Sequence, residues 1–113
     1  MNEIETLLEQ MIAKIMSTNE YTQYYELLQR VKSNNEVYAR IGDYRRRSLW
    51  VQMQEGEDFI HGNSELQKDF ADLQENGLVN EFFAAEHQYV AMIRKIQDHF
   101  LEGISLDTTF LDG

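Results

Sequence analysis

Apolar residues recur along this chain every three or four positions, the spacing that puts them on one face of an α-helix. The first run begins at Ile4 and should end near Ser17. The second extends from Tyr21 to Val31, and residues 34–35 are both asparagine. An asparagine side chain accepts a hydrogen bond from a free amide, so either of these two can cap the next helix. The first third of the chain therefore predicts two amphipathic helices.

The next run predicts a long helix over about residues 36–61. One apolar stripe includes Ile41, whereas other apolar residues spread around the helix. A helix that is apolar on several sides contacts more than one neighbour. Gly62 suits the left-handed position that follows many helices, and Ser64 can then cap a short helix that ends near Gly77.

The clearest periodicity covers residues 78–102, where one stripe steps alternately by three and four residues over three heptads. After Gly103 the period is lost. The stripe consists of Val79, Phe82, Glu86, Tyr89, Ile93, Ile96 and Phe100.

We therefore predict an all-α fold, a five-helix bundle with two long antiparallel helices and three shorter ones. The long helices, about 36–61 and 78–102, should lie against each other. Residues 1–104 should form a single helical domain, and residues 105–113 an extended C-terminal tail. Helices of about 25 residues span roughly 37 Å, and the short helices cannot cover both along their length. We therefore expect surplus apolar surface that contacts a second chain, so that the protein is at least a dimer.

The composition of the chain excludes several classes of functional site. The 113 residues include no proline and no cysteine, so disulfides, thiolate nucleophiles and metal sites built on protein sulfur are excluded. The acidic N-terminus does not resemble a signal peptide, and no apolar run reaches the roughly 18 residues that a membrane span needs. We therefore expect a cytoplasmic protein that does not bind a membrane.

The net charge of −10 argues against direct nucleic-acid binding, since phosphate contacts normally need lysine or arginine. Five of the six arginines nevertheless lie between Arg30 and Arg47. They suggest either a phosphate-binding patch or ion pairs with neighbouring helices. Arg45, Arg46 and Arg47 are consecutive, so on a helix they point in three directions and form no stripe. Ion pairing is the simpler interpretation.

Glu86 lies in the middle of the apolar stripe of the last helix. An unpaired carboxylate there would cost several kcal/mol. We therefore predict a buried ion pair between Glu86 and an arginine of the preceding long helix, either Arg40 or Arg47. A role for Glu86 in binding a partner or a metal is the alternative.

Metal and catalytic motifs have little support. Asp58 and His61 have the spacing of half a di-iron helix motif, which needs a second such pair and two more carboxylates. Neither His87 nor His99 has an acidic residue three positions before it. No catalytic motif is present either. The sequence thus predicts no enzyme, no catalytic or metal-binding residue and no cofactor, although a metal-binding or small-ligand helical bundle remains the alternative function.

Protein interaction is better supported. Tryptophan and arginine are enriched at binding hot spots. The long helix predicted at 36–61 carries both, together with apolar residues on several of its sides. The predicted interaction residues are Tyr44, Arg46, Arg47, Trp50 and Met53.

The order and spacing of several short motifs resemble the YlbF/YmcA family of small, helical bacterial regulators over nearly the whole chain. Ser17-x-x-Glu20-Tyr21-x-x-Tyr24 opens the second helix. Gly77-Leu78-Val79-Asn80-Glu81-Phe82 opens the last one and is followed by Ala85-Glu86 and Ile93-x-x-Ile96. The tail carries Ile104-Ser105-Leu106-Asp107-x-x-Phe110.

This resemblance implies a non-enzymatic cytoplasmic protein that forms homo- or hetero-oligomers. It implies that the partners are the chain itself, other proteins of the same family, or an RNA-processing enzyme. The best-known members act with sister proteins on RNase Y-dependent processing of messenger RNA and affect competence, sporulation and biofilm formation. Those members can hold iron–sulfur clusters through cysteines, which this chain lacks. A homo-oligomer that joins no larger complex is a further alternative.

Overall fold

The computed structural model describes residues 2–105 and 109, and within this part of the chain the ordered elements are helices. The all-α prediction is confirmed, but the described residues form six helices instead of the five expected. The tail predicted to be extended lies, apart from Ser105 and Thr109, outside the described residues. The helices are α1 (Asn2–Met16), α2 (Asn19–Lys32), α3 (Asn35–Gln52), α4 (Gly56–Asp69), α5 (Ala71–Gln74) and α6 (Gly77–Gly103).

Side chains cap three of these helices at their N-termini. The Asn34 Oδ1 accepts a hydrogen bond from the Val37 amide at 3.2 Å, as one of the two predicted caps. The Asn76 Oδ1 does the same for Val79 at the start of α6. At the start of α2 the cap is Thr18. Each cap satisfies an amide that has no partner within its helix.

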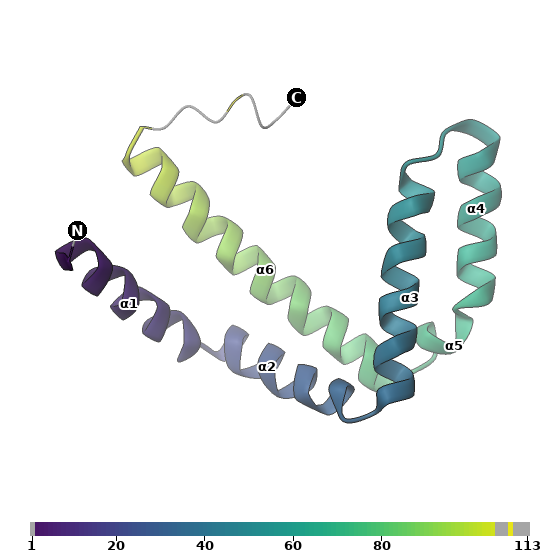
Figure 1. The fold of residues 1–113 in the computed structure, drawn as a ribbon, viewed down its shortest axis with the longest axis horizontal. Coiled ribbons are helices and arrows are strands. Elements are labelled where there is room, and N and C mark those ends of the chain that lie inside the picture. The colour runs from purple at the N-terminus through teal and green to yellow at the C-terminus, as the bar shows by residue number, and fades with distance from the viewer. Residues whose placement is uncertain (1, 106–108, 110–113) are drawn as a thin grey trace.

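The prediction of one helix over 36–61 is wrong, because the chain reverses between α3 and α4. The amides of Met53 and Gln54 donate to carbonyls three residues earlier, which tightens the last turn of α3. Glu55 is extended, and Gly56 has a φ of +59°. Glycine adopts this left-handed conformation without steric cost. The reversal lays α4 back along α3 as an antiparallel hairpin (Figure 1).

Gly62 lies inside α4, so its predicted place after a helix is also wrong. A Cβ at this position would be 3.3 Å from the Cγ2 of Val51 on α3. Gly62 therefore allows the backbones of α3 and α4 to approach closely. Ser64, predicted to cap a new helix, lies within α4 as well.

The core forms where the two arms of the molecule meet. It is built from α2, α3, the end of α4, α5 and the start of α6. Its buried members are Val31, Ile41, Leu66, Phe70, Leu73, Val79 and Phe82. An aromatic cluster extends it along α2 and α6, where the Tyr24 ring stacks on that of Tyr89 with centroids 4.9 Å apart.

The two long segments do not lie against each other, and this prediction is wrong. α6 packs instead on α2, and no Cα atom of α3 comes within 8 Å of one in α6. Figure 1 shows α3 and α6 diverging from the shared base as the two arms of a V. The radius of gyration is 18.2 Å, against about 13 Å for a compact chain of this length. The V shape therefore leaves much of each arm uncovered.

Candidate functional site

Two arginines of α3 attach this helix to α4 and α5. The Arg40 Nη2 lies 2.6 Å from Asp72 Oδ1 and 2.8 Å from the Asp69 carbonyl oxygen. The Arg47 Nη1 lies 2.8 Å from Asp69 Oδ2. Both guanidinium groups also lie over the Phe70 ring, at 4.3 and 5.3 Å. The hydrogen bond from Arg40 holds the pKa of Asp72 below its usual value.

Glu86 pairs with Arg45, so the prediction of Arg40 or Arg47 as its partner is wrong. The Arg45 Nη2 lies 2.6 Å from the Glu86 Oε1. The side chains of Glu86 and Arg45 are 27% and 47% exposed, so the pair is half-buried. Arg45 also lies near the rings of Phe82 and Phe83 on α6. Because α3 and α6 diverge, the long arginine side chain reaches across to α6, beside the Tyr44 ring that stacks on Phe83.

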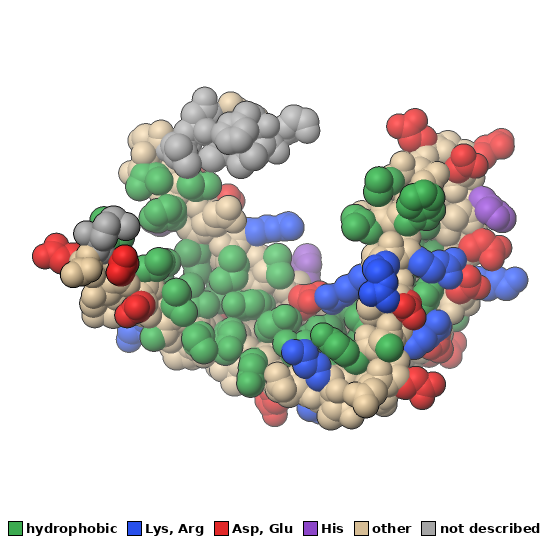
Figure 2. Space-filling model, in the orientation of Figure 1, with side chains coloured by type: hydrophobic (Ala, Val, Ile, Leu, Met, Phe, Trp, Pro, Cys, Tyr) green, Lys and Arg blue, Asp and Glu red, His purple; other side chains and the backbone are tan. Residues whose placement is uncertain are grey.

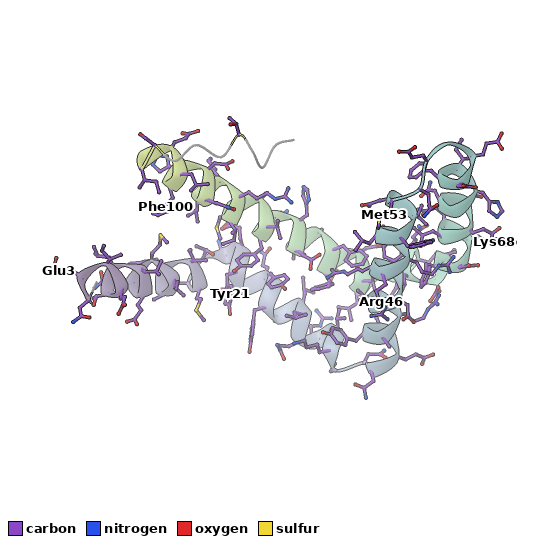
Figure 3. The ribbon with its side chains drawn as sticks, turned by 45° about the horizontal axis from the view of Figure 1, so that its top comes forward. Glu3, Tyr21, Arg46, Met53, Lys68 and Phe100 are labelled. Carbon is purple, nitrogen blue, oxygen red and sulfur yellow. The ribbon has the colours of Figure 1, made fainter. Side chains whose placement is uncertain are left out.

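The structure divides the five predicted interaction residues into two groups. Tyr44 packs against the core, edge-on to Phe70 and stacked on Phe83. Arg47 is engaged with Asp69. Figure 3 labels Arg46 on α3 and Met53 directly after the C-terminal end of this helix.

The three remaining residues, Arg46, Trp50 and Met53, lie on the exposed side of α3. Arg46 pairs with Asp43 one turn earlier on the same helix, and its side chain is 73% exposed. Trp50 and Met53 are 64% and 69% exposed.

Exposed apolar side chains lie near the free end of the α3–α4 hairpin, and Figure 2 shows hydrophobic side chains at the end of that arm. They come from both helices, and none belongs to the core. We call them together the hairpin-tip surface; its residues are Leu49, Trp50, Met53, Phe59 and Ile60.

A second exposed apolar surface lies on the other arm. α1 has no buried residue, and it contacts α2 only at their junction, without close approach of its backbone to α6. The apolar faces of α1 and α6 point toward an open gap between them, which we call the α1–α6 wedge. It is lined by Leu8, Met11, Ile15, Ile93, Ile96, Gln97 and Phe100.

Other kinds of site find little support in the structure. Among the described residues, no three His, Asp or Glu side chains are grouped so that they could hold a metal ion. His61 and Asp58 lie on α4, both exposed. No helix in the described part of the chain has the length and apolar character needed to cross a membrane.

Sequence reasoning missed several residues of these surfaces. Leu49, Phe59 and Ile60 were missed because the assumption of one continuous helix over 36–61 gave no sign that the chain turns back between them. Gly56 was the available signal, because a glycine between polar residues often marks a turn. The exposure of α1 had no local signal, since its amphipathic pattern is that of a helix whose apolar face is covered.

Comparison with known proteins agrees with the resemblance seen in the sequence. Residues 4–105 match the family described as control of the competence regulator ComK, YlbF/YmcA. Neither the curated proteins nor the solved structures contain a significant match. The matched region spans all six helices, including both exposed surfaces. The chain therefore belongs to the YlbF/YmcA family.

Proposed function

We propose that this protein is a non-enzymatic regulatory module that acts by binding other proteins and modulates RNase Y-dependent RNA processing in the cytoplasm. Membership of a family that controls a competence regulator supports the regulatory part. The observation that carries the interaction part is the hairpin-tip surface. The downstream effects would be on competence, sporulation or biofilm formation.

The chemistry of the hairpin-tip surface suits a protein partner. Fully burying a large apolar side chain contributes about 1.5–3 kcal/mol, and five such side chains are 40–69% exposed here. A central tryptophan with a neighbouring arginine is the composition of a binding hot spot, and Trp50 and Arg46 supply both. A partner that covers this surface would therefore gain substantial binding energy.

The basic residues of α3 are poorly placed to bind RNA directly. Arg40, Arg45 and Arg47 are engaged with carboxylates of α5, α6 and α4. The net charge of −10 would also repel a polyanion. We therefore propose that the protein reaches RNA through a protein partner, either RNase Y or another family member.

The test is to replace the chromosomal gene with the Trp50→Ser variant. We expect loss of co-purification with RNase Y or with sister proteins, and accumulation of transcripts that RNase Y normally processes. Tyr38→Ser is the matched control, because Tyr38 is an exposed aromatic residue on the same helix, about 18 Å from Trp50 at 1.5 Å per residue. Normal transcripts and competence in the Trp50→Ser strain would contradict the proposal.

A further inference from the structure

We propose that the space between α3 and α6 binds an amphipathic helix of a different protein, one whose apolar face is flanked by acidic residues. This inference rests on the proposed function, since it names the chemistry of a partner for the interaction module. We call this space the V notch; its residues are Leu49, Met53, His87, Val90, Arg94 and Lys95.

The ion pair between Arg45 and Glu86 marks the inner faces of both helices, because its two side chains point across the gap. Residues four positions apart lie on one face of a helix. The residues that continue the inner faces above the pair are Leu49 and Met53 beside α3, and Val90 and Arg94 on α6. Each face rises about 12 Å over these eight residues, and a helix with its side chains is about 10–12 Å across. The V notch is therefore about as deep as one helix is wide.

Apolar side chains near the base of the V notch are available to a partner. Leu49 is 63% exposed and Val90 is 39% exposed. Along α6 runs a groove of about 340 Å³, which Val90, His87 and Arg94 help to line. Figure 1 shows α2 along the other side of α6, and Figure 2 shows a histidine and basic side chains inside the V. The V notch thus combines apolar and basic groups.

Charge in the V notch favours an acidic partner. In the described part of the chain neither Arg94 nor Lys95 forms an ion pair. Asp98 lines the same groove and offsets one of these two cations, whereas Glu86 is already paired with Arg45. One cation is therefore left for a carboxylate of the partner. The net charge of −10 opposes this only weakly, because exposed charges more than about 8 Å away are largely screened at physiological ionic strength.

The partner segment is a helix because the V notch offers no backbone groups for pairing. Both sides of the notch are helices, whose amides and carbonyls are bonded within the helix. An extended segment buried there would leave its own backbone amides and carbonyls without partners, which costs free energy. A helix pairs these groups internally and places apolar residues along one face, as in other helix-in-groove complexes.

The first experiment measures, by fluorescence anisotropy, the binding of two synthetic stapled helices of about four turns. Both carry the same leucine stripe, which is flanked by glutamates in one peptide and by lysines in the other. We expect the wild-type protein to bind the glutamate peptide at least about tenfold more tightly than the lysine peptide. Arg94→Glu should reverse this preference, because it replaces the cation that faces the peptide by a carboxylate.

Arg30→Glu is the matched control for the charge change. Arg30 is exposed on α2, and in the described part of the chain it forms no ion pair. This variant should keep the preference for the glutamate peptide. Circular dichroism should show that Arg94→Glu melts close to the wild type, since Arg94 is also exposed and unpaired.

The second experiment identifies the partner segment in the native host. Benzoylphenylalanine in place of Val90 cross-links on illumination to whatever fills the V notch, and mass spectrometry maps the attached peptide. We expect a segment with helical apolar spacing in which Asp and Glu outnumber Lys and Arg. Its capture should be lost with Arg94→Glu and kept with Arg30→Glu.

Several outcomes would overturn the inference. They are no binding of the glutamate peptide, equal binding of the two peptides, an unchanged preference in Arg94→Glu, and capture of a basic segment, of RNA or of a second copy of this chain. These outcomes are separate from the test of the proposed function. Dependence of RNA processing on Trp50 would stand with an empty V notch, and preference for the glutamate peptide would stand if RNase Y were not the partner.

Discussion

The Arg45 Nη2 on α3 lies 2.6 Å from the Glu86 Oε1 on α6 and joins two helices whose backbones do not touch. The pair sits at the base of the V, beside the rings of Phe82 and Phe83. Together with the Tyr44 ring that stacks on Phe83, it therefore helps to set the angle between the two arms.

Glu86→Gln should lower the free energy of unfolding by about 0.5–1 kcal/mol, since it removes a charge-assisted hydrogen bond from a half-buried pair. A double-mutant cycle with Arg45→Met checks this by chemical denaturation at fixed protein concentration. We expect the two substitutions to be non-additive. Additive losses would mean that the pair contributes nothing to stability.

Gly56→Ala should destabilise the protein by about 1–2 kcal/mol. Gly56 has a φ of +59°, and a residue with a Cβ loses about this much free energy in the left-handed conformation. No atom lies within 4 Å of the added Cβ, so the loss would come from the backbone alone. Gly77→Ala is the control, since Gly77 also has open space but no positive φ. Equal stability of the two variants would contradict the role given to Gly56.

Gly62→Val should separate α3 from α4 and lower the melting temperature by several degrees. The added Cβ would lie 3.3 Å from the Val51 Cγ2, and the two further methyl groups have no room on that side. Val51→Ala in the same chain should restore part of the loss by opening space. If Gly62→Val alone were as stable as the wild type, the close packing of the hairpin would be disproved.

The Tyr24 phenol should lose its proton at a higher pH than the phenol of an ordinary tyrosine. Burial is the main cause that raises the pKa of its phenol, and the charge of Glu86 adds to it. Because the folded state favours the neutral phenol, this contribution to stability is complete below pH 10 and is lost as the pH rises through the raised pKa. Ultraviolet absorbance of tyrosinate can be compared between wild type and Tyr24→Phe during a pH titration. The substitution should remove a group that ionises at higher pH than the other tyrosines. Loss of a group that ionises at lower pH than the others would contradict this assignment.

The sequence by itself determined the features that depend only on residues close together along the chain. Helical periodicity identified the all-α class and the whole of α6, and Asn34 could be named as a cap because capping uses an amide only three residues away. The order of short motifs identified the family. The break at Met53–Glu55 was missed because methionine, glutamine and glutamate are good helix formers and only Gly56 interrupts them.

Only the tertiary structure decided which surfaces meet. The choice of Arg45 over Arg40 and Arg47 as the partner of Glu86 follows from the angle between the arms, which no local pattern contains. The same angle leaves α1 and the hairpin tip uncovered. An amphipathic stripe shows that a face should be buried, but not against what. That depends on how α5 and the start of α6 orient the two arms, through contacts between residues far apart in the chain.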